Sequence, residues 1–180
     1  MSDAFDYDVS GAYLQDTWTV NDDFEIKAAL RVDSVTADFT DPSKPGIEID
    51  ETVVSPRLDA RYFHTDFWVS RFSAGRGYRA PLSFFETDHG LLDGGVGFEI
   101  DVDALERSQS YSYALSYEGS RLSSTLSATW TEVDDLAQLS ETSAGVPLMT
   151  QLSESASVSA LDWAVSYRFC LLYTSDAADE

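Results

Sequence analysis

The chain has 180 residues, with 32 Asp and Glu against 11 Lys and Arg, which gives a net charge of −21 at pH 7. This acidic balance argues against a nucleic-acid surface, which needs clustered Lys and Arg. A composition that is 43% hydrophobic and 13% aromatic is too apolar for a disordered acidic tail, and the length suits one domain.

The beginning of the chain shows no targeting signal. Residues 1–6 lack the basic region and the apolar stretch of a signal peptide, so we expect either a cytoplasmic protein or a true N-terminus further upstream. No apolar run of about 18 residues exists, which excludes a transmembrane helix. Barrel strands stay possible, because each needs only about 9–11 alternating residues.

A period of two residues dominates the chain and predicts strands. Residues 12–20 give a first strand whose apolar face Asp16 interrupts, and in residues 24–33 every second residue is apolar without exception. The alternation returns in five further segments, at residues 54–62, 68–78, 110–117, 122–131 and 161–169. No helical period is present. The fold class predicted is therefore all-β, an antiparallel up-and-down meander of about seven strands.

The predicted connections alternate between short and long. Residues 21–23, 65–66 and 118–120 are tight turns, whereas residues 38–52, 79–107 and 137–154 are long connections. We expect every long connection at one edge and no parallel strand pair, which is the layout of an outer-membrane barrel. Aromatic side chains near the short turns match an interfacial girdle, and they are Trp18, Phe24, Tyr62, Phe67, Trp68 and Tyr117.

The two faces of these strands differ in chemistry. On a convex, lipid-facing side we expect the leucines Leu30, Leu58, Leu115 and Leu126. On the opposite, concave side we expect the arginines Arg31, Arg57 and Arg61. Charged groups of both signs could not line a dry core without a large desolvation cost. The alternative is a soluble, secreted β-sandwich adhesion module with a solvated polar face.

An ordered series of motifs resembles the TonB-dependent outer-membrane receptors. The series includes Ser55-Pro56-Arg57-Leu58 and Gly75-Arg76-Gly77-Tyr78-Arg79-Ala80-Pro81, the latter followed by Glu86. Residues 13–18 (YLQDTW) and 28–33 are similar to earlier strands of that family, and residues 105–115 and 129–136 to later ones. Residues 104–105 replace the proline that the family carries before its glutamate.

The resemblance implies a non-enzymatic uptake protein in the outer membrane of a Gram-negative bacterium. Typical cargo is a siderophore-type iron complex, a corrinoid, haem or an oligosaccharide. Its partners are the membrane lipid, its own plug domain and, through the plug, the TonB complex. Such a barrel has about 22 strands, so we expect residues 1–169 to be a partial segment of a large transmembrane β-barrel. A porin or a barrel enzyme is the remaining alternative.

The alternation ends abruptly after Phe169. Residues 170–180 look like the translation of a sequencing adapter, and we interpret them as a non-native tail outside the fold. Their Cys170 is the single cysteine, which excludes a disulfide framework and a cysteine-based zinc site.

The longest connection, residues 79–107, is the predicted cargo contact. The residues expected to touch cargo there are Phe84, Phe85, Glu86, Leu91, Leu92 and Phe98. Six acidic residues in this connection favour neutral or cationic cargo, namely Asp88, Asp93, Glu99, Asp101, Asp103 and Glu106. Their spacing matches no calcium loop, and His64 and His89 are expected at opposite ends of the strands, so we predict no metal site.

We also predict no cofactor and no catalytic group. The spacing Gly75-x-Gly77-x-x-Ala80 fits a dinucleotide fingerprint, but no helical period follows it, as that chemistry requires. Ser, His and Asp all occur without the arrangement of a nucleophilic triad.

Overall fold

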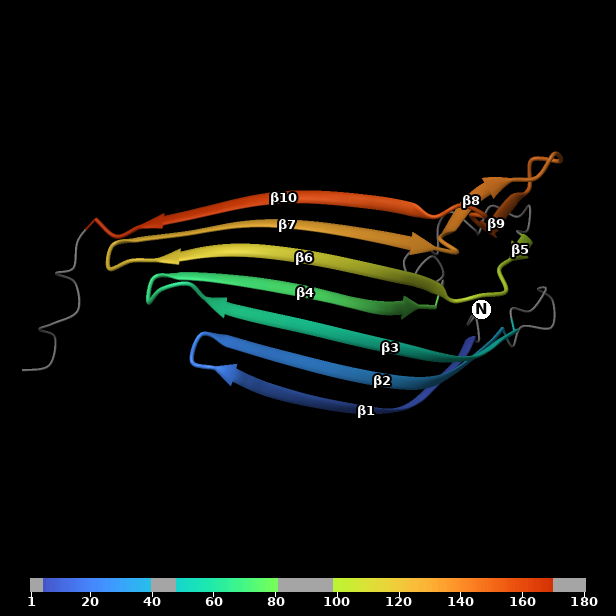
Figure 1. Cartoon of the computed structure of the whole chain (residues 1–180). Helices are drawn as coiled ribbons and strands as arrows, with labels where there is room; N and C mark the ends of the chain where they lie inside the picture. Colours follow the sequence, from blue (N-terminus) through green and yellow to red (C-terminus); the bar gives the residue numbers. More distant parts are fainter. Residues whose placement is uncertain (1–4, 40–47, 81–98, 170–180) are drawn as a thin grey trace, which may run out of the picture.

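The computed structural model describes residues 5–39, 48–80 and 99–169, and all regular structure in these ranges is β-strand. Within them, no helix is long and apolar enough to cross a membrane. Seven strands lie side by side in one sheet, and three short strands form a second sheet near one end of it (Figure 1).

The large sheet is an antiparallel meander in which each strand pairs with the next long strand along the chain. Its strands are β1 (Phe5–Asn21), β2 (Phe24–Phe39), β3 (Glu48–Phe63), β4 (Trp68–Arg79), β6 (Glu106–Glu118), β7 (Leu122–Asp134) and β10 (Ala156–Tyr167). The predicted fold class is therefore confirmed.

Short turns close one end of this sheet, which we call the short-turn end. They join β1 to β2, β3 to β4 and β6 to β7, and they lie on the left in Figure 1. Local polar contacts shape them: Asn21 Oδ1 accepts from Asp23 N at 3.0 Å, and Thr65 Oγ1 accepts from Trp68 N at 3.2 Å. The long connections all leave from the opposite, long-connection end, as predicted.

Several strands are longer than the alternation of apolar residues indicated. β1 begins at Phe5 rather than at residue 12, and β2 continues to Phe39 rather than ending at residue 33. Residues 34–38 are paired on both sides, with β1 and with β3. Apolar residues of these extensions, such as Val9, Val35 and Ala37, still alternate with polar ones, but they are one position out of phase with the apolar residues of 12–20 and 24–33. An alternation followed in a single phase therefore underestimated the strand lengths.

The second sheet was not predicted. It consists of β5 (Glu99–Asp101), β8 (Ala137–Glu141) and β9 (Pro147–Gln151), which lie inside connections expected to be loops. β8 and β9 are antiparallel, but β5 and β9 pair in parallel. The expectation of no parallel pair holds for the large sheet and is wrong for this one, because strands of three to five residues are too short to show a period.

The predicted division of leucines and arginines between two faces is confirmed by the register. Leu126 is directly opposite Leu115, and Leu58 is opposite both Ala28 and Ala74. Arg61 is opposite Glu25 on β2, one residue out of phase with the leucines. Since successive side chains alternate sides, we call these the apolar face and the charged face of the large sheet.

The buried core lies on the charged face at the long-connection end. Its members come from β2, β3 and β9, from the residue after β4 and from the link between β5 and β6. They are Val35, Ala37, Ile49, Val53, Ala80, Val102, Leu105 and Met149. On the apolar face, the described residues form no comparable core, and Leu14 and Trp163 are 77% and 74% exposed. The large sheet thus leaves its most apolar surface uncovered.

Candidate functional site

The residues predicted to contact cargo lie outside the described residues. Phe84, Phe85, Glu86, Leu91, Leu92 and Phe98 all fall within residues 81–98, so their role stays a prediction. The end of the same connection is described, and there Val102 and Leu105 are buried in the core. This part of the connection packs onto the sheet instead of extending away from it.

Glu106, one of the six acidic residues of the longest connection, is buried and paired. Its side chain is only 3% exposed, and its carboxylate forms an ion pair with Arg79, whose Nε donates to Oε2 at 2.6 Å. The other oxygen, Oε1, accepts from the backbone nitrogen of Ala137 at 3.0 Å. One carboxylate therefore joins the start of the β4–β6 connection to the start of β8.

Two further polar side chains hold the connections in place. Glu51 accepts from Leu105 N at 3.2 Å through Oε1 and pairs with Arg107 through Oε2. Gln151 Nε2 donates to Ala104 O at 3.0 Å and to Asp135 O at 2.8 Å. Sequence reasoning missed both, because the partners are as many as 56 residues apart and no local pattern links them.

A buried carboxylate lies beside this core, on the charged face. Asp33 is fully buried, and Arg31 Nε donates to its Oδ2 at 2.7 Å. Gly11 is opposite Asp33 on β1, and a Cβ added there would overlap Asp33 Oδ1 and lie 3.0 Å from Val32 O. The absence of a side chain at residue 11 is what leaves room for this carboxylate.

Nearer the short-turn end, the charged face holds a hollow of about 420 Å³, which we call the charged hollow. Six charged side chains line it: Glu25, Lys27, Arg57, Asp59, Arg61 and Arg71. Arg57 Nε lies 3.0 Å from Asp59 Oδ2, and Arg61 Nη1 lies 3.8 Å from Glu25 Oε1. Such exposed pairs contribute only about 0–1 kcal/mol each, so this surface does little to stabilise the sheet alone.

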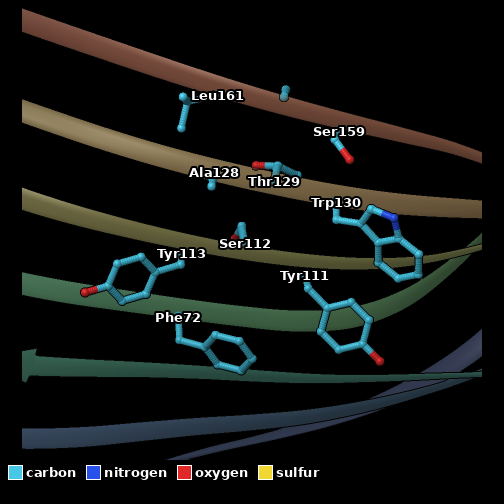
Figure 2. A pocket seen from close by; sticks show the side chains of 10 residues that line it. Phe72, Tyr111, Ser112, Tyr113, Ala128, Thr129, Trp130, Ser159 and Leu161 are labelled. Atoms are coloured by element: carbon cyan, nitrogen blue, oxygen red, sulfur yellow. The ribbon is translucent and has the colours of Figure 1, made fainter.

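The apolar face has its own hollow of about 500 Å³ above β4, β6, β7 and β10. Figure 2 shows the rings of Phe72, Tyr111, Tyr113 and Trp130 around it, with Leu161 on the neighbouring strand. Tyr111 and Trp130 are stacked at a centroid distance of 5.7 Å. Most of this surface is apolar or aromatic, which suits contact with acyl chains or other apolar groups.

Aromatic side chains cluster near the short turns, as predicted. Trp68 and Tyr117 have ring centroids 5.1 Å apart, and Phe24 and Tyr62 are 6.2 Å apart. The rings of Trp18, Tyr62 and Trp68 are exposed. Their amphipathic rings would suit the depth of lipid headgroups.

Within the described ranges, no three His, Cys, Asp or Glu residues are grouped so that they could hold a metal ion. His64 lies at the turn between β3 and β4, where its Nε2 is 2.7 Å from Ser70 Oγ. His89 falls outside the described residues.

Comparison with known proteins identifies the sheet. A family model described as "TonB dependent receptor-like, beta-barrel" matches residues 1–174. No curated protein sequence matches the chain.

Solved structures share the fold at low sequence identity. The FrpB iron transporter from Neisseria meningitidis superposes with a TM-score of 0.67 at 16% identity. The match covers 89% of this chain and 23% of the FrpB chain. The copper transporter OprC gives a TM-score of 0.69 at 15% identity, and the match covers 91% of this chain and 27% of the OprC chain. The alcaligin outer-membrane receptor FauA from Bordetella pertussis gives a TM-score of 0.60 at 16% identity, and the match covers 93% of this chain and 28% of the FauA chain.

The chain thus spans about a quarter of the length of the structures that it matches. The motif series, the strand order of the meander and the family match agree. The chain belongs to the TonB-dependent receptor family, of whose β-barrel it forms a segment.

Proposed function

We propose that this segment is part of the wall of an outer-membrane receptor in a Gram-negative bacterium, with the apolar face toward lipid and the charged face toward the barrel interior. The observation that carries the proposal is the different chemistry of the two faces of the large sheet. Large apolar side chains are exposed on one face of all seven strands, and charged pairs lie on the other. A sheet in water would not leave so much apolar surface uncovered.

The complete protein would import a scarce ligand and would have no enzymatic activity. A siderophore-type iron complex is the first candidate cargo, since the similar structures include the FrpB iron transporter and the ferric-catecholate import receptor Fiu of E. coli. A corrinoid, haem or an oligosaccharide is the alternative within this class. A plug domain inside the barrel would couple uptake to the TonB complex.

Fractionation of bacteria that express the full-length receptor tests the location. We expect the receptor in the detergent-extracted outer membrane, with an electrophoretic mobility that changes on heating, as folded barrels show. Recovery as a stable soluble protein would support the β-sandwich alternative instead. Growth under iron limitation, with one candidate cargo supplied at a time, then identifies the cargo.

Residues 84–98 are the part of the longest connection that we propose contacts cargo. Replacing them with a short Gly/Ser linker in the full-length receptor should weaken cargo binding by about tenfold or more, ~1.4 kcal/mol, in equilibrium binding to purified receptor. The replacement stops at residue 98 because β5 begins at Glu99 and Val102 is part of the core.

A change at the short-turn end is the matched control for this replacement. Substituting Asp22→Asn together with Asp23→Gly keeps a tight turn and should leave cargo affinity unchanged. If the linker variant inserts normally and binds cargo with the affinity of the parent receptor, residues 84–98 are not part of the binding site.

A further inference from the structure

β3 is paired along its length on one side but only in part on the other. Its residues 48–62 pair with β2, whereas among the described residues its pairing with β4 runs only from Arg57 to Phe63. β4 itself stays paired with β6 up to Arg79. β3 and β4 therefore draw apart toward the long-connection end (Figure 1), and we call the boundary between residues 48–56 and 76–79 the seam.

The separation of the two strands begins at a proline. His64 N donates to Trp68 O at 2.9 Å, and hydrogen-bonded pairs recur at every second residue of an antiparallel ladder. Pro56, which the register places opposite Arg76, falls at one of these positions. Proline has no N–H to donate there, so the ladder is weakened where the seam begins.

Gly77 and Ser55 show that the strands are apart beyond the proline. A Cβ added at Gly75 would lie 3.5 Å from Pro56 O, whereas within 4 Å a Cβ added at Gly77 would meet, among the described residues, only Ser108 Oγ at 3.2 Å. Ser55, opposite Gly77 in the register, has a buried hydroxyl oxygen without a hydrogen-bond partner in the described part of the chain. An unpaired buried polar atom lowers the stability of the arrangement that contains it.

The position of Tyr78 depends on this separation. Tyr78 is four residues after Ala74, which is opposite Leu58 on the apolar face, so alternation along β4 places Tyr78 on that face too. Its ring nevertheless packs against the buried core on the charged face. We attribute this to the separation of β3 and β4, which leaves room for the ring between them.

Side chains link the outer half of β3 to the longest connection. Glu51 accepts from Leu105 N at 3.2 Å and pairs with Arg107. Val53 is buried in the same core as Leu105. The position of the outer half of β3 therefore determines how firmly the end of this connection is packed.

We propose that the seam is a two-state element, in which β3 and β4 can also pair further, Ser55 with Gly77 and Val54 with Tyr78, so that the Tyr78 ring leaves the core. This closed state gains the backbone hydrogen bonds of the Val54–Tyr78 pair and loses the apolar burial of the Tyr78 ring, two effects of similar size. Because the same core holds Leu105, closing the seam loosens the end of the longest connection.

This inference deepens the proposed function and rests on it, since the longest connection is the proposed cargo contact. The open seam holds that connection against the sheet, and the closed seam releases it. The wall of the barrel would thus regulate how firmly the cargo contact is held.

Disulfide trapping in the full-length receptor in outer membranes tests the closed state. There Ser55 and Gly77 would form a non-hydrogen-bonded pair with Cα atoms about 4.5 Å apart, which suits a disulfide. Ser55→Cys with Gly77→Cys should therefore crosslink on mild oxidation, as detected by mass spectrometry. Arg57→Cys with Gly75→Cys, the last pair before the seam, is the matched control and should crosslink in both states. A control that crosslinks beside a seam variant that does not would overturn the proposal.

Restoring the missing backbone donor should shift the equilibrium toward the closed state. Adding Pro56→Ala to the seam variant supplies an N–H opposite Arg76, so the rate of crosslinking should rise about tenfold. The same substitution should leave the crosslinking rate of the control pair unchanged. Equal rates with and without Pro56→Ala in the seam variant would contradict a two-state seam.

Hydrogen exchange measured by mass spectrometry tests the link to the longest connection. Locking the seam with the disulfide should speed exchange of the amides of residues 102–107 about tenfold, and a reductant should reverse the effect. Pro56→Ala without any cysteine should speed the same amides, although it adds a hydrogen-bond donor to the sheet. Unchanged exchange in both variants would overturn the inference. A receptor absent from the outer membrane would instead contradict the proposed function, and fractionation shows this separately.

Discussion

Substitution of Leu126 by arginine is expected to destabilise the full-length receptor by about 2–4 kcal/mol, the cost of a charged side chain near the middle of the lipid face of a barrel. Leu126 lies between Leu115 on β6 and Trp163 on β10, and all three are on the apolar face. Its side chain is 46% exposed in this sheet, so lipid is the surrounding that it would contact. Equilibrium urea unfolding in lipid vesicles measures the change in free energy.

The neighbouring residue provides the control for this substitution. Ser127 points to the opposite face and is directly across from Asp162, which offers an arginine a carboxylate partner. Ser127→Arg is expected to change the free energy of unfolding by less than about 1 kcal/mol. If both substitutions lower the free energy of unfolding by the same amount, the apolar face is not the one that contacts lipid.

The second large effect is expected at Gly11. Gly11→Ala should lower the free energy of unfolding of the receptor by about 1–3 kcal/mol, the usual cost of overpacking a filled site. The new methyl group would overlap Asp33 Oδ1, and Asp33 is fully buried and held by Arg31. The carboxylate can move only by weakening this ion pair.

A second glycine and a double variant separate this clash from a general effect of alanine in a strand. Gly75→Ala should cost little, because a Cβ there would meet only ordinary contacts, the nearest being Pro56 O at 3.5 Å. Combining Gly11→Ala with Asp33→Ala should give a total smaller than the sum of the two single effects, since the second change removes the overlapping atoms. Strictly additive effects in denaturant titrations would show that Gly11 and Asp33 are not coupled.

The conformation of individual strands and turns could be predicted from the sequence because local rules govern both. Alternation from Phe24 to Asp33 requires a two-faced strand, and Asn21 and Thr65 shape tight turns through contacts with residues two or three positions away. The same alternation assigned Leu126 and Arg61 to opposite faces, which the register confirms. The predicted cargo residues fall within residues 81–98 and stay a prediction.

Strand ends and the packing at the long-connection end could not be predicted in this way. Residues 5–10 and 34–39 pair with each other, but their apolar residues are one position out of phase with those in the rest of each strand. Val35 and Ala37 therefore lie on the charged face, and only the tertiary structure shows that they are buried there. Glu106 has the same local sequence signal as any acidic residue in a loop, yet it is buried against Arg79 and Ala137. Its burial depends on β4, which carries Arg79 27 residues earlier in the chain, and on β8, which begins with Ala137 31 residues later.

The sequence by itself determined that this protein is a two-faced antiparallel meander with its turns at one end and its long connections at the other, and its motifs pointed to the family. These properties follow from side-chain periodicity and turn chemistry, which act over a few residues. Only the tertiary structure decided that β5, β8 and β9 form a second sheet, that Asp33 is buried beside Gly11, and that Lys27 and Arg71 share one hollow. These features depend on the register between strands far apart in the chain, where packing and charge compensation over the whole sheet select one arrangement.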